Sequence, residues 1–167
     1  MKVLILGNGQ LGQMLGKAAI QQGHECILYS DRDHQVKALG SQQALGLTLE
    51  EAKEWADVVT WEHEHLADEL IDATADKWLL KASLFRQLTD RRTQKALCDT
   101  LEIPTSEWQP FNDAAELESI LADCDRAVVI KSAKGGYDGK GQWRWKPGQA
   151  KDDIIAEAGQ RPGIVED

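Results

Sequence analysis

Long apolar segments are absent from the 167 residues of this chain. The first apolar run, residues 3–6, stops at Gly7 and is too short for the core of a signal peptide. No later run approaches the roughly 20 residues that a transmembrane helix needs. Internal repeats and low-complexity tracts are also missing. We therefore expect a folded, soluble, cytoplasmic protein.

Cysteine is scarce, and basic residues are outnumbered. Cys26, Cys98 and Cys124 are odd in number and show no metal or redox spacing, which predicts thiols in a reducing compartment. Lys and Arg total 19 against 28 Asp and Glu, a net charge of −9. Such an acidic chain is a poor partner for nucleic acid or an anionic membrane, although a local basic site can still bind a small phosphorylated ligand.

The N-terminal segment reads as strand, glycine turn and helix. Residues 2–6 form a continuous apolar run, as in strands buried on both faces of a parallel sheet. The turn GNGQLG occupies residues 7–12, and apolar residues from 11 to 18 recur at helical spacing. Residues 25–29 begin the next strand. A βαβ unit of this length predicts a parallel sheet with a right-handed crossover.

This glycine turn also matches a dinucleotide-binding pattern. Asp31 lies about 20 residues beyond the turn, the distance at which such folds place an acid on the ribose. One interpretation is therefore an oxidoreductase that uses a nicotinamide or flavin cofactor. The turn alone is not decisive, because helix N-termini carry about half a positive charge and bind other anions too.

Acidic and histidine residues follow the strand predicted at 57–62. Glu62, His63, Glu64 and His65 suggest a metal site, but adjacent strand residues point to opposite faces and cannot all converge on one ion. We predict no metal site here. The acids instead belong to the crevice that forms at the carboxyl ends of parallel strands.

The middle of the chain is predicted to hold one long helix, residues 83–102. Its charged residues, Arg91 and Lys95 among them, read as a solvated face. Pro104 ends the helix, which places a domain boundary between residues 102 and 103. The second part is predicted to contain strands at 105–109 and 163–167 and helices at 112–121 and 151–158.

A glycine-rich loop, GGYDGKGQ at residues 135–142, lies between strands predicted at 127–131 and 143–145. Glycines let the backbone approach a ligand closely, and exposed amides favour anions. Lys131 ends the first strand beneath the loop. This combination suits a polyphosphate.

In this order the segments resemble the ATP-grasp enzymes of purine synthesis, and among them the 5-(carboxyamino)imidazole ribonucleotide synthase family. The resemblance covers the whole chain. It rests on residues 7–12 (GNGQLG), 60–64 (TWEHE), 90–95 (DRRTQK), 103–105 (IPT), 129–131 (VIK), 135–143 (GGYDGKGQW) and 164–166 (IVE). The implied α/β fold is a Rossmann-like pre-ATP-grasp domain, residues 1–102, with a parallel sheet covered by helices on both faces. The first part of an ATP-grasp domain, residues 103–167, follows.

The resemblance implies carboxylation of 5-aminoimidazole ribonucleotide by ATP and bicarbonate through carboxyphosphate. The implied ATP-binding residues are Arg91, Lys131, Gly136, Tyr137, Asp138, Gly139, Lys140, Gly141, Gln142, Glu166 and Asp167. Tyr137, Asp138 and Lys140 would be catalytic, facing bicarbonate and the nucleotide amine, although some relatives carry arginine in place of Lys140. Gly9, Gln10 and Leu11 would hold the ribonucleotide phosphate.

Enzymes of this family continue well past the strand at which this chain stops. The expected Mg²⁺ ligands lie in that further part, so no metal-binding residue is assigned within 1–167, and we expect the chain alone to be inactive. The resemblance also implies a homodimer. The formate-dependent glycinamide ribonucleotide transformylases, the more distant biotin-dependent carboxylases and a non-catalytic remnant of the fold remain alternatives.

Overall fold

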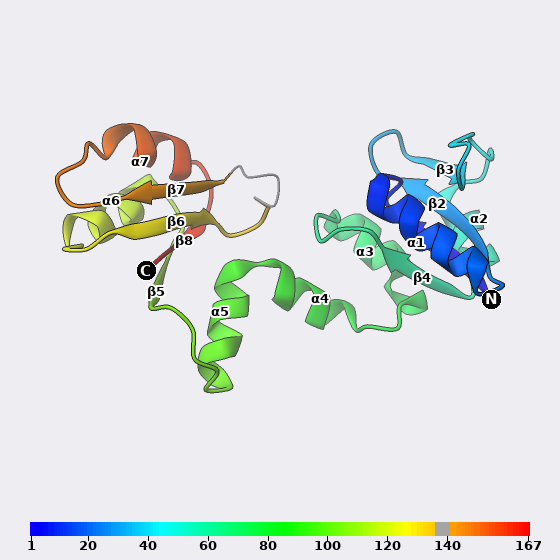
Figure 1. Ribbon diagram of the computed structural model, residues 1–167, viewed down its shortest axis with the longest axis horizontal. Helices are drawn as coiled ribbons and strands as arrows, with labels where there is room; N and C mark the ends of the chain where they lie inside the picture. Colours follow the sequence, from blue (N-terminus) through cyan, green and yellow to red (C-terminus); the bar gives the residue numbers. More distant parts are fainter. Residues whose placement is uncertain (136–140) are drawn as a thin grey trace. The chain divides into compact units, whose positions relative to one another are not determined.

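The computed structural model describes residues 1–135 and 141–167. Its contacts divide the chain into two compact units, Met1–Phe85 and Arg86–Asp167. Both combine strands and helices, as the predicted α/β class requires (Figure 1). None of the helices in the described ranges is long and apolar enough to cross a membrane.

The first unit is built on a four-stranded sheet in the order β3-β2-β1-β4. Strands β1 (Lys2–Leu6), β2 (Glu25–Ser30) and β4 (Val58–Trp61) pair in parallel, which confirms the predicted parallel sheet. Strand β3 (Gln35–Ala38) adds an antiparallel edge that the sequence reading missed.

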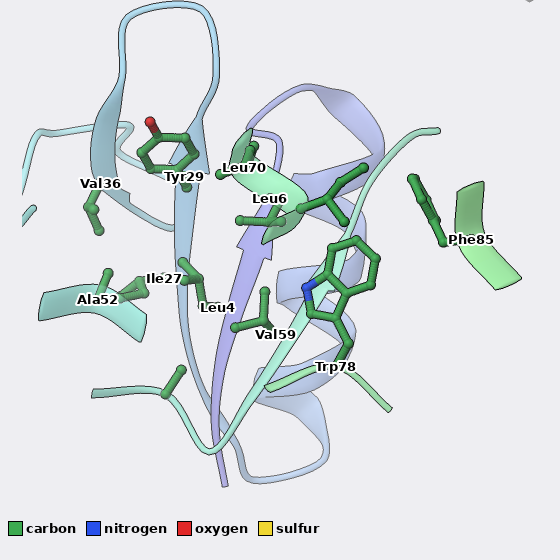
Figure 2. Close-up of a cluster of buried hydrophobic side chains, with 12 residues drawn as sticks. Leu4, Leu6, Ile27, Tyr29, Val36, Ala52, Val59, Leu70, Trp78 and Phe85 are labelled. Atoms are coloured by element: carbon green, nitrogen blue, oxygen red, sulfur yellow. The ribbon is translucent and has the colours of Figure 1, made fainter. Parts of the chain in front are cut away.

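Helices cover both faces of this sheet, as predicted. One face is covered by helices α2 (Leu49–Trp55) and α3 (Asp68–Thr74), by the short 3₁₀ helix η1 (Ala75–Lys77) and by the segment that follows η1 (Figure 2). The buried side chains of this face are Leu4, Leu6, Ile27, Tyr29, Val36, Ala52, Ala56, Val59, Leu70, Ile71, Trp78 and Phe85. The other face buries Val3, Ile5 and Leu28 beside helix α1 (Gln10–Gln21).

Helix α1 meets the sheet through glycines. Gly12 and Gly16 are its buried residues, and a Cβ at Gly16 would lie 2.5 Å from Leu39 Cδ1. Leu11 and Met14 are 49% and 56% exposed. The apolar spacing therefore predicted the helix correctly, but the glycines, and not the larger apolar residues, face the sheet.

The second unit is an antiparallel sheet in the order β5-β8-β6-β7. Its strands are β5 (Trp108–Phe111), β6 (Val128–Ser132), β7 (Gln142–Trp145) and β8 (Gly163–Glu166). Helices α6 (Ala114–Ala122) and α7 (Asp152–Ala158) bury one face. The residues of this core are Phe111, Leu117, Leu121, Val128, Ile130, Trp145, Ala158 and Val165.

The prediction of one helix over residues 83–102 was wrong. The segment forms α4 (Ala82–Thr89) and α5 (Arg91–Thr100), separated at Asp90. Asp90 is extended, with φ −107° and ψ 121°, and its carboxylate accepts a hydrogen bond from the Arg92 N–H at 2.9 Å. This N-cap starts a new helix where a continuous one was expected.

Helix α5 belongs to the second unit. The Arg91 N–H donates to the Ala133 carbonyl at 2.8 Å, and Lys95 forms an ion pair with Glu166 of β8 at 2.9 Å. The second compact unit consequently begins ahead of α5, at Arg86. A domain boundary between residues 102 and 103 stays a prediction.

Candidate functional site

The glycine turn of the first unit surrounds the carboxylate of Glu62. Glu62 follows β4 directly, and its own N–H donates to the Leu6 carbonyl at 2.9 Å. Trp61 fixes the end of that strand, since its ring lies 4.4 Å from Trp78, centroid to centroid. The Glu62 carboxylate then accepts a 2.7 Å hydrogen bond from the Gly9 N–H at the start of α1.

Three glycines leave the space that this carboxylate fills. A Cβ at Gly9 would lie 2.2 Å from Glu62 Oε1, and a Cβ at Gly12 would lie 2.5 Å from Oε2. At Gly7 the corresponding distance to Oε2 is 2.6 Å, and φ is +110°, which favours glycine. The spacing of the glycine motif thus reflects the Glu62 side chain.

An acid at the N-terminus of α1 determines which ligands suit that position. Gly9, Gln10 and Leu11 are exposed, so the site opens to solvent. Glu62 offers acceptor oxygens, which suit a hydroxyl or an amine and oppose a phosphate by like-charge repulsion. The assignment of Gly9, Gln10 and Leu11 to a substrate phosphate stays a prediction, and Glu62 is a further residue of this site.

The close fit of Glu62 and Gly9 predicts strong energetic coupling. Gly9 has φ −74°, so alanine there costs little in backbone strain, and the three atoms nearest to its Cβ would all belong to Glu62. We expect Gly9→Ala to destabilise the first unit by about 1–3 kcal/mol, the usual cost of overpacking. In a Glu62→Ala background the same change should cost less than about 0.5 kcal/mol, because the side chain that the new methyl group would meet is gone, and effects of residues in contact are not additive.

Urea unfolding of the four proteins of this double-mutant cycle, followed by tryptophan fluorescence, measures the coupling. Gly23→Ala is unsuitable as the control because Gly23 has φ +79°. Ala18→Gly, on the exposed side of α1, reports the backbone effect of a glycine–alanine exchange alone. Equal costs of Gly9→Ala in both backgrounds would contradict the placement of Glu62.

In the second unit the structure brings Lys131, Glu166 and Lys95 together. Lys131 is the next-to-last residue of β6 and forms an ion pair with Glu166 Oε1, because β6 and β8 pair with Ile130 opposite Val165. Lys95 reaches Glu166 Oε2 from α5 at 2.9 Å. Val165 lies in the core beneath α6 and α7, so its strand neighbour Glu166 faces the opposite side of the sheet.

The two lysines determine the charge state of Glu166. Burial opposes ionisation of this carboxyl, but hydrogen bonds from Lys131 and Lys95 outweigh burial and lower its pKa below the usual value. The Ser106 hydroxyl also donates to Oε2, at 3.2 Å. Glu166 is therefore an anion held between two cations, and the cluster carries a net positive charge.

Arg91 lies at the segment that leads into the glycine-rich loop. Its Nη1 donates to the carbonyls of Ser132 at 2.8 Å and Gly135 at 2.6 Å. The backbone N–H of the same residue is bonded to Ala133. Arg91 thus positions the chain directly before the loop, whatever else it contacts.

The other predicted ATP-binding residues fall into three groups. Gly141 and Gln142 are the last residues of the loop segment, and Gln142 is opposite Lys131 in the β6–β7 register. Asp167 is not brought to Lys131, because it forms an ion pair with Arg126 Nε at 2.8 Å. Gly136, Tyr137, Asp138, Gly139 and Lys140 lie outside the described residues.

Lys95 is a site residue that the sequence reading assigned to a solvated face. It stands four positions after Arg91 in α5, so both project from one side of the helix. That spacing was the available signal. Across the described ranges, no group of three or more His, Cys, Asp or Glu side chains is placed to hold a metal ion.

The chain matches two known domain families over most of its length. Residues 1–82 match the ribonucleotide synthetase preATP-grasp domain, and residues 96–167 match the ATP-grasp domain. The N5-carboxyaminoimidazole ribonucleotide synthase of Vibrio cholerae is 36% identical over 148 residues, which is 87% of this chain and 39% of that protein. The synthase of Vibrio parahaemolyticus is 34% identical over 159 residues, 94% of this chain and 42% of that protein.

Over most of its own length the chain is similar to the N5-carboxyaminoimidazole ribonucleotide synthases. It spans about two fifths of the length of these synthases. The two domain matches confirm the predicted order, a pre-ATP-grasp domain followed by ATP-grasp residues.

Solved structures of synthases have the same fold. The Staphylococcus aureus enzyme complexed with ADP gives a TM-score of 0.80 at 18% identity, with 99% of this chain and 46% of that chain covered. The Aspergillus clavatus synthase, in complex with ADP and 5-aminoimidazole ribonucleotide, gives 0.73 at 23% identity, with the same coverage of both chains.

Proposed function

We propose that this chain belongs to the N5-carboxyaminoimidazole ribonucleotide synthase family and contributes the residues described above to an ATP-dependent carboxylation. Bicarbonate and ATP would form carboxyphosphate, and the exocyclic amine of 5-aminoimidazole ribonucleotide would accept the carboxyl group, with ADP and phosphate released. The observation that carries the proposal is the Lys131–Glu166–Lys95 cluster at the base of the glycine-rich segment. Sequence identity to the N5-carboxyaminoimidazole ribonucleotide synthases of two Vibrio species supports 5-aminoimidazole ribonucleotide as the substrate.

The cluster suits the ATP half of this reaction. Phosphoryl transfer depends mainly on positioning and on neutralising phosphate charge, and Lys131 can supply an ammonium for that purpose. Arg91 of α5 holds the segment that leads into the loop through the carbonyls of Ser132 and Gly135. Glu166 and Asp167 are assigned to the hinge beside adenine and ribose. ADP in the Staphylococcus aureus synthase supports ATP as the ligand.

The turn of the first unit is assigned to the ribonucleotide. Gly9, Gln10 and Leu11 are exposed around the Glu62 carboxylate, which can accept hydrogen bonds from sugar hydroxyls. The nucleotide bound to the Aspergillus clavatus synthase supports this substrate. Tyr137, Asp138 and Lys140 remain the proposed catalytic residues beside bicarbonate and the amine.

Magnesium would accompany ATP in this proposal and neutralise phosphate charge. The acids of the described ranges do not form a three-ligand site, so none of them is assigned to the metal. A homodimer and a cytoplasmic location also stay predictions. Analytical ultracentrifugation tests the dimer, for which exposed Met14 of α1 is a candidate contact.

Phosphate release tests the proposed reaction. For a longer enzyme that contains these residues, we expect phosphate release from ATP that requires both bicarbonate and 5-aminoimidazole ribonucleotide. For the 167-residue chain alone, we expect ATP binding without turnover. Intact mass establishes which of the two proteins is in the assay. Omission of either co-substrate is the control. Release that depends on formate and glycinamide ribonucleotide would instead identify a transformylase.

The oxidoreductase interpretation is not favoured. Asp31, which would hold the ribose of a dinucleotide, lies 3.6 Å from His63 Nε2, and Glu62 occupies the glycine turn where a pyrophosphate would bind. The family match places the chain with ATP-grasp proteins. Titration with NADH, followed by its fluorescence, checks this expectation and should show no saturable binding.

A further inference from the structure

Among the described residues of the second unit, the buried Glu166 carboxylate has two cationic partners. The side chains of Glu166, Lys95 and Lys131 are 9%, 13% and 28% exposed. One lysine suffices to balance the charge of Glu166. The second therefore needs a different explanation.

The two lysines are held differently. Besides Glu166, Lys95 donates to Thr105 Oγ1 at 2.6 Å and to Ser106 Oγ at 2.8 Å. Lys131 is the more exposed lysine. Lys95 is thus fixed by neutral oxygens on the segment before β5, whereas Lys131 is better placed to turn toward a ligand.

A phosphate that takes Lys131 from Glu166 would remove half of the compensating charge. A buried carboxylate with no cationic partner is strongly unfavourable and takes up a proton instead. Lys95 prevents this outcome, since its hydrogen bonds keep it beside Oε2 after Lys131 has moved.

We propose that Lys95 is a positioning residue for nucleotide binding: it keeps Glu166 ionised and in place while Lys131 exchanges that carboxylate for a phosphate of ATP. The proposal rests on the proposed function, in which Lys131 binds the phosphates. It adds a role for Lys95 that acts through Glu166 and not through contact with ATP.

The other charged groups near Glu166 are one paired arginine and several acids. Arg126 forms ion pairs with Glu107 and Asp167. The charged residues that line a pocket of about 720 Å³ together with Glu166 are Asp99, Glu107, Asp123, Asp125, Arg126 and Asp167. Lys131 from β6 and Lys95 from α5 are the cations bonded directly to the Glu166 carboxylate.

The test is the protonation change that accompanies binding. A non-hydrolysable ATP analogue is titrated calorimetrically into the chain in buffers of different ionisation enthalpy. We expect Lys95→Met to weaken binding at least tenfold at pH 7.5 and to add uptake of a proton relative to wild type, because Glu166 then loses both cations. Binding by this variant should accordingly tighten as pH falls, by more than wild-type binding does.

Matched variants separate charge from structure. Lys95→Arg keeps the charge and should restore binding without the added proton uptake. Lys95→Met combined with Glu166→Gln should lose the added uptake, because no carboxylate remains to protonate. Lys151→Met removes a lysine that pairs with Glu118 at 3.4 Å elsewhere in the unit and should match wild type. Lys95→Gln, whose amide can still donate to Ser106, replaces Lys95→Met if that variant does not fold.

Two results would overturn the proposal. One is wild-type affinity in both Lys95→Met and Lys95→Gln. The other is weaker binding without added proton uptake, which is what a purely structural role produces. Failure of the proposed function looks different: Lys131→Met would then bind the analogue as wild type does, or wild type would not bind it at all.

Discussion

Replacing Glu166 with alanine should destabilise the second unit by about 3–5 kcal/mol, the usual cost of removing one partner from a buried ion pair. The reason is that Lys131 and Lys95 would be left close together without their shared carboxylate. Urea unfolding of wild type and variant at pH 7 measures the difference. Glu118→Ala, which removes the acid of an exposed pair with Lys151, is the control and should cost less than about 1 kcal/mol.

The effect of Glu166→Ala should also depend on pH. The folded-state pKa of Glu166 is lowered, so its contribution is fully present above the pKa of the unfolded chain, about 4.3 for glutamate. The contribution is lost as pH falls through the lower folded-state pKa. The difference in the free energy of unfolding between wild type and variant should therefore be the same at pH 6 and pH 7 and should shrink below about pH 4. A difference that stays constant down to pH 3 would mean that the Glu166 charge does not contribute.

Local patterns in the sequence identified most secondary-structure elements because those patterns are short-range. The GNGQLG turn and the apolar run before it predicted β1 and α1. The same kind of pattern failed at Asp90, where polar residues continue the helical spacing but the aspartate carboxylate caps a new helix. An N-cap signal was present in the sequence, but an aspartate inside a charged helix reads equally well as a solvated residue.

The candidate site was less accessible from sequence because strand pairing assembles it. Lys131 and Glu166 meet because β6 and β8 are antiparallel neighbours, which no local spacing encodes. The family resemblance supplied both residues but not their contact. Glu62 was read as an acid at the ligand crevice, and its enclosure by Gly9 and Gly12 became visible only from the backbone geometry.

Replacing Lys131 with methionine should weaken ATP binding about 10- to 100-fold. A hydrogen bond to a charged group contributes about 1.5–3 kcal/mol, and each 1.4 kcal/mol is a factor of ten in affinity. Lys95 cannot take over this role, because Thr105 and Ser106 hold its ammonium beside Glu166. Dissociation constants from a fluorescent ATP analogue measure the loss, with Lys151→Met as the control for removal of a positive charge.

The dependence on phosphate number shows where Lys131 acts. If its ammonium contacts the phosphates, Lys131→Met should weaken ATP and ADP binding but leave the affinity for adenosine within about twofold of wild type, because adenosine offers no anion. An equal loss for all three ligands would indicate that the variant disturbs strand β8 through Glu166, the ion-pair partner of Lys131. Unchanged ATP affinity would place the phosphates away from β6. Only a loss of affinity for ATP and ADP together with unchanged affinity for adenosine identifies Lys131 as the phosphate-binding lysine of this site.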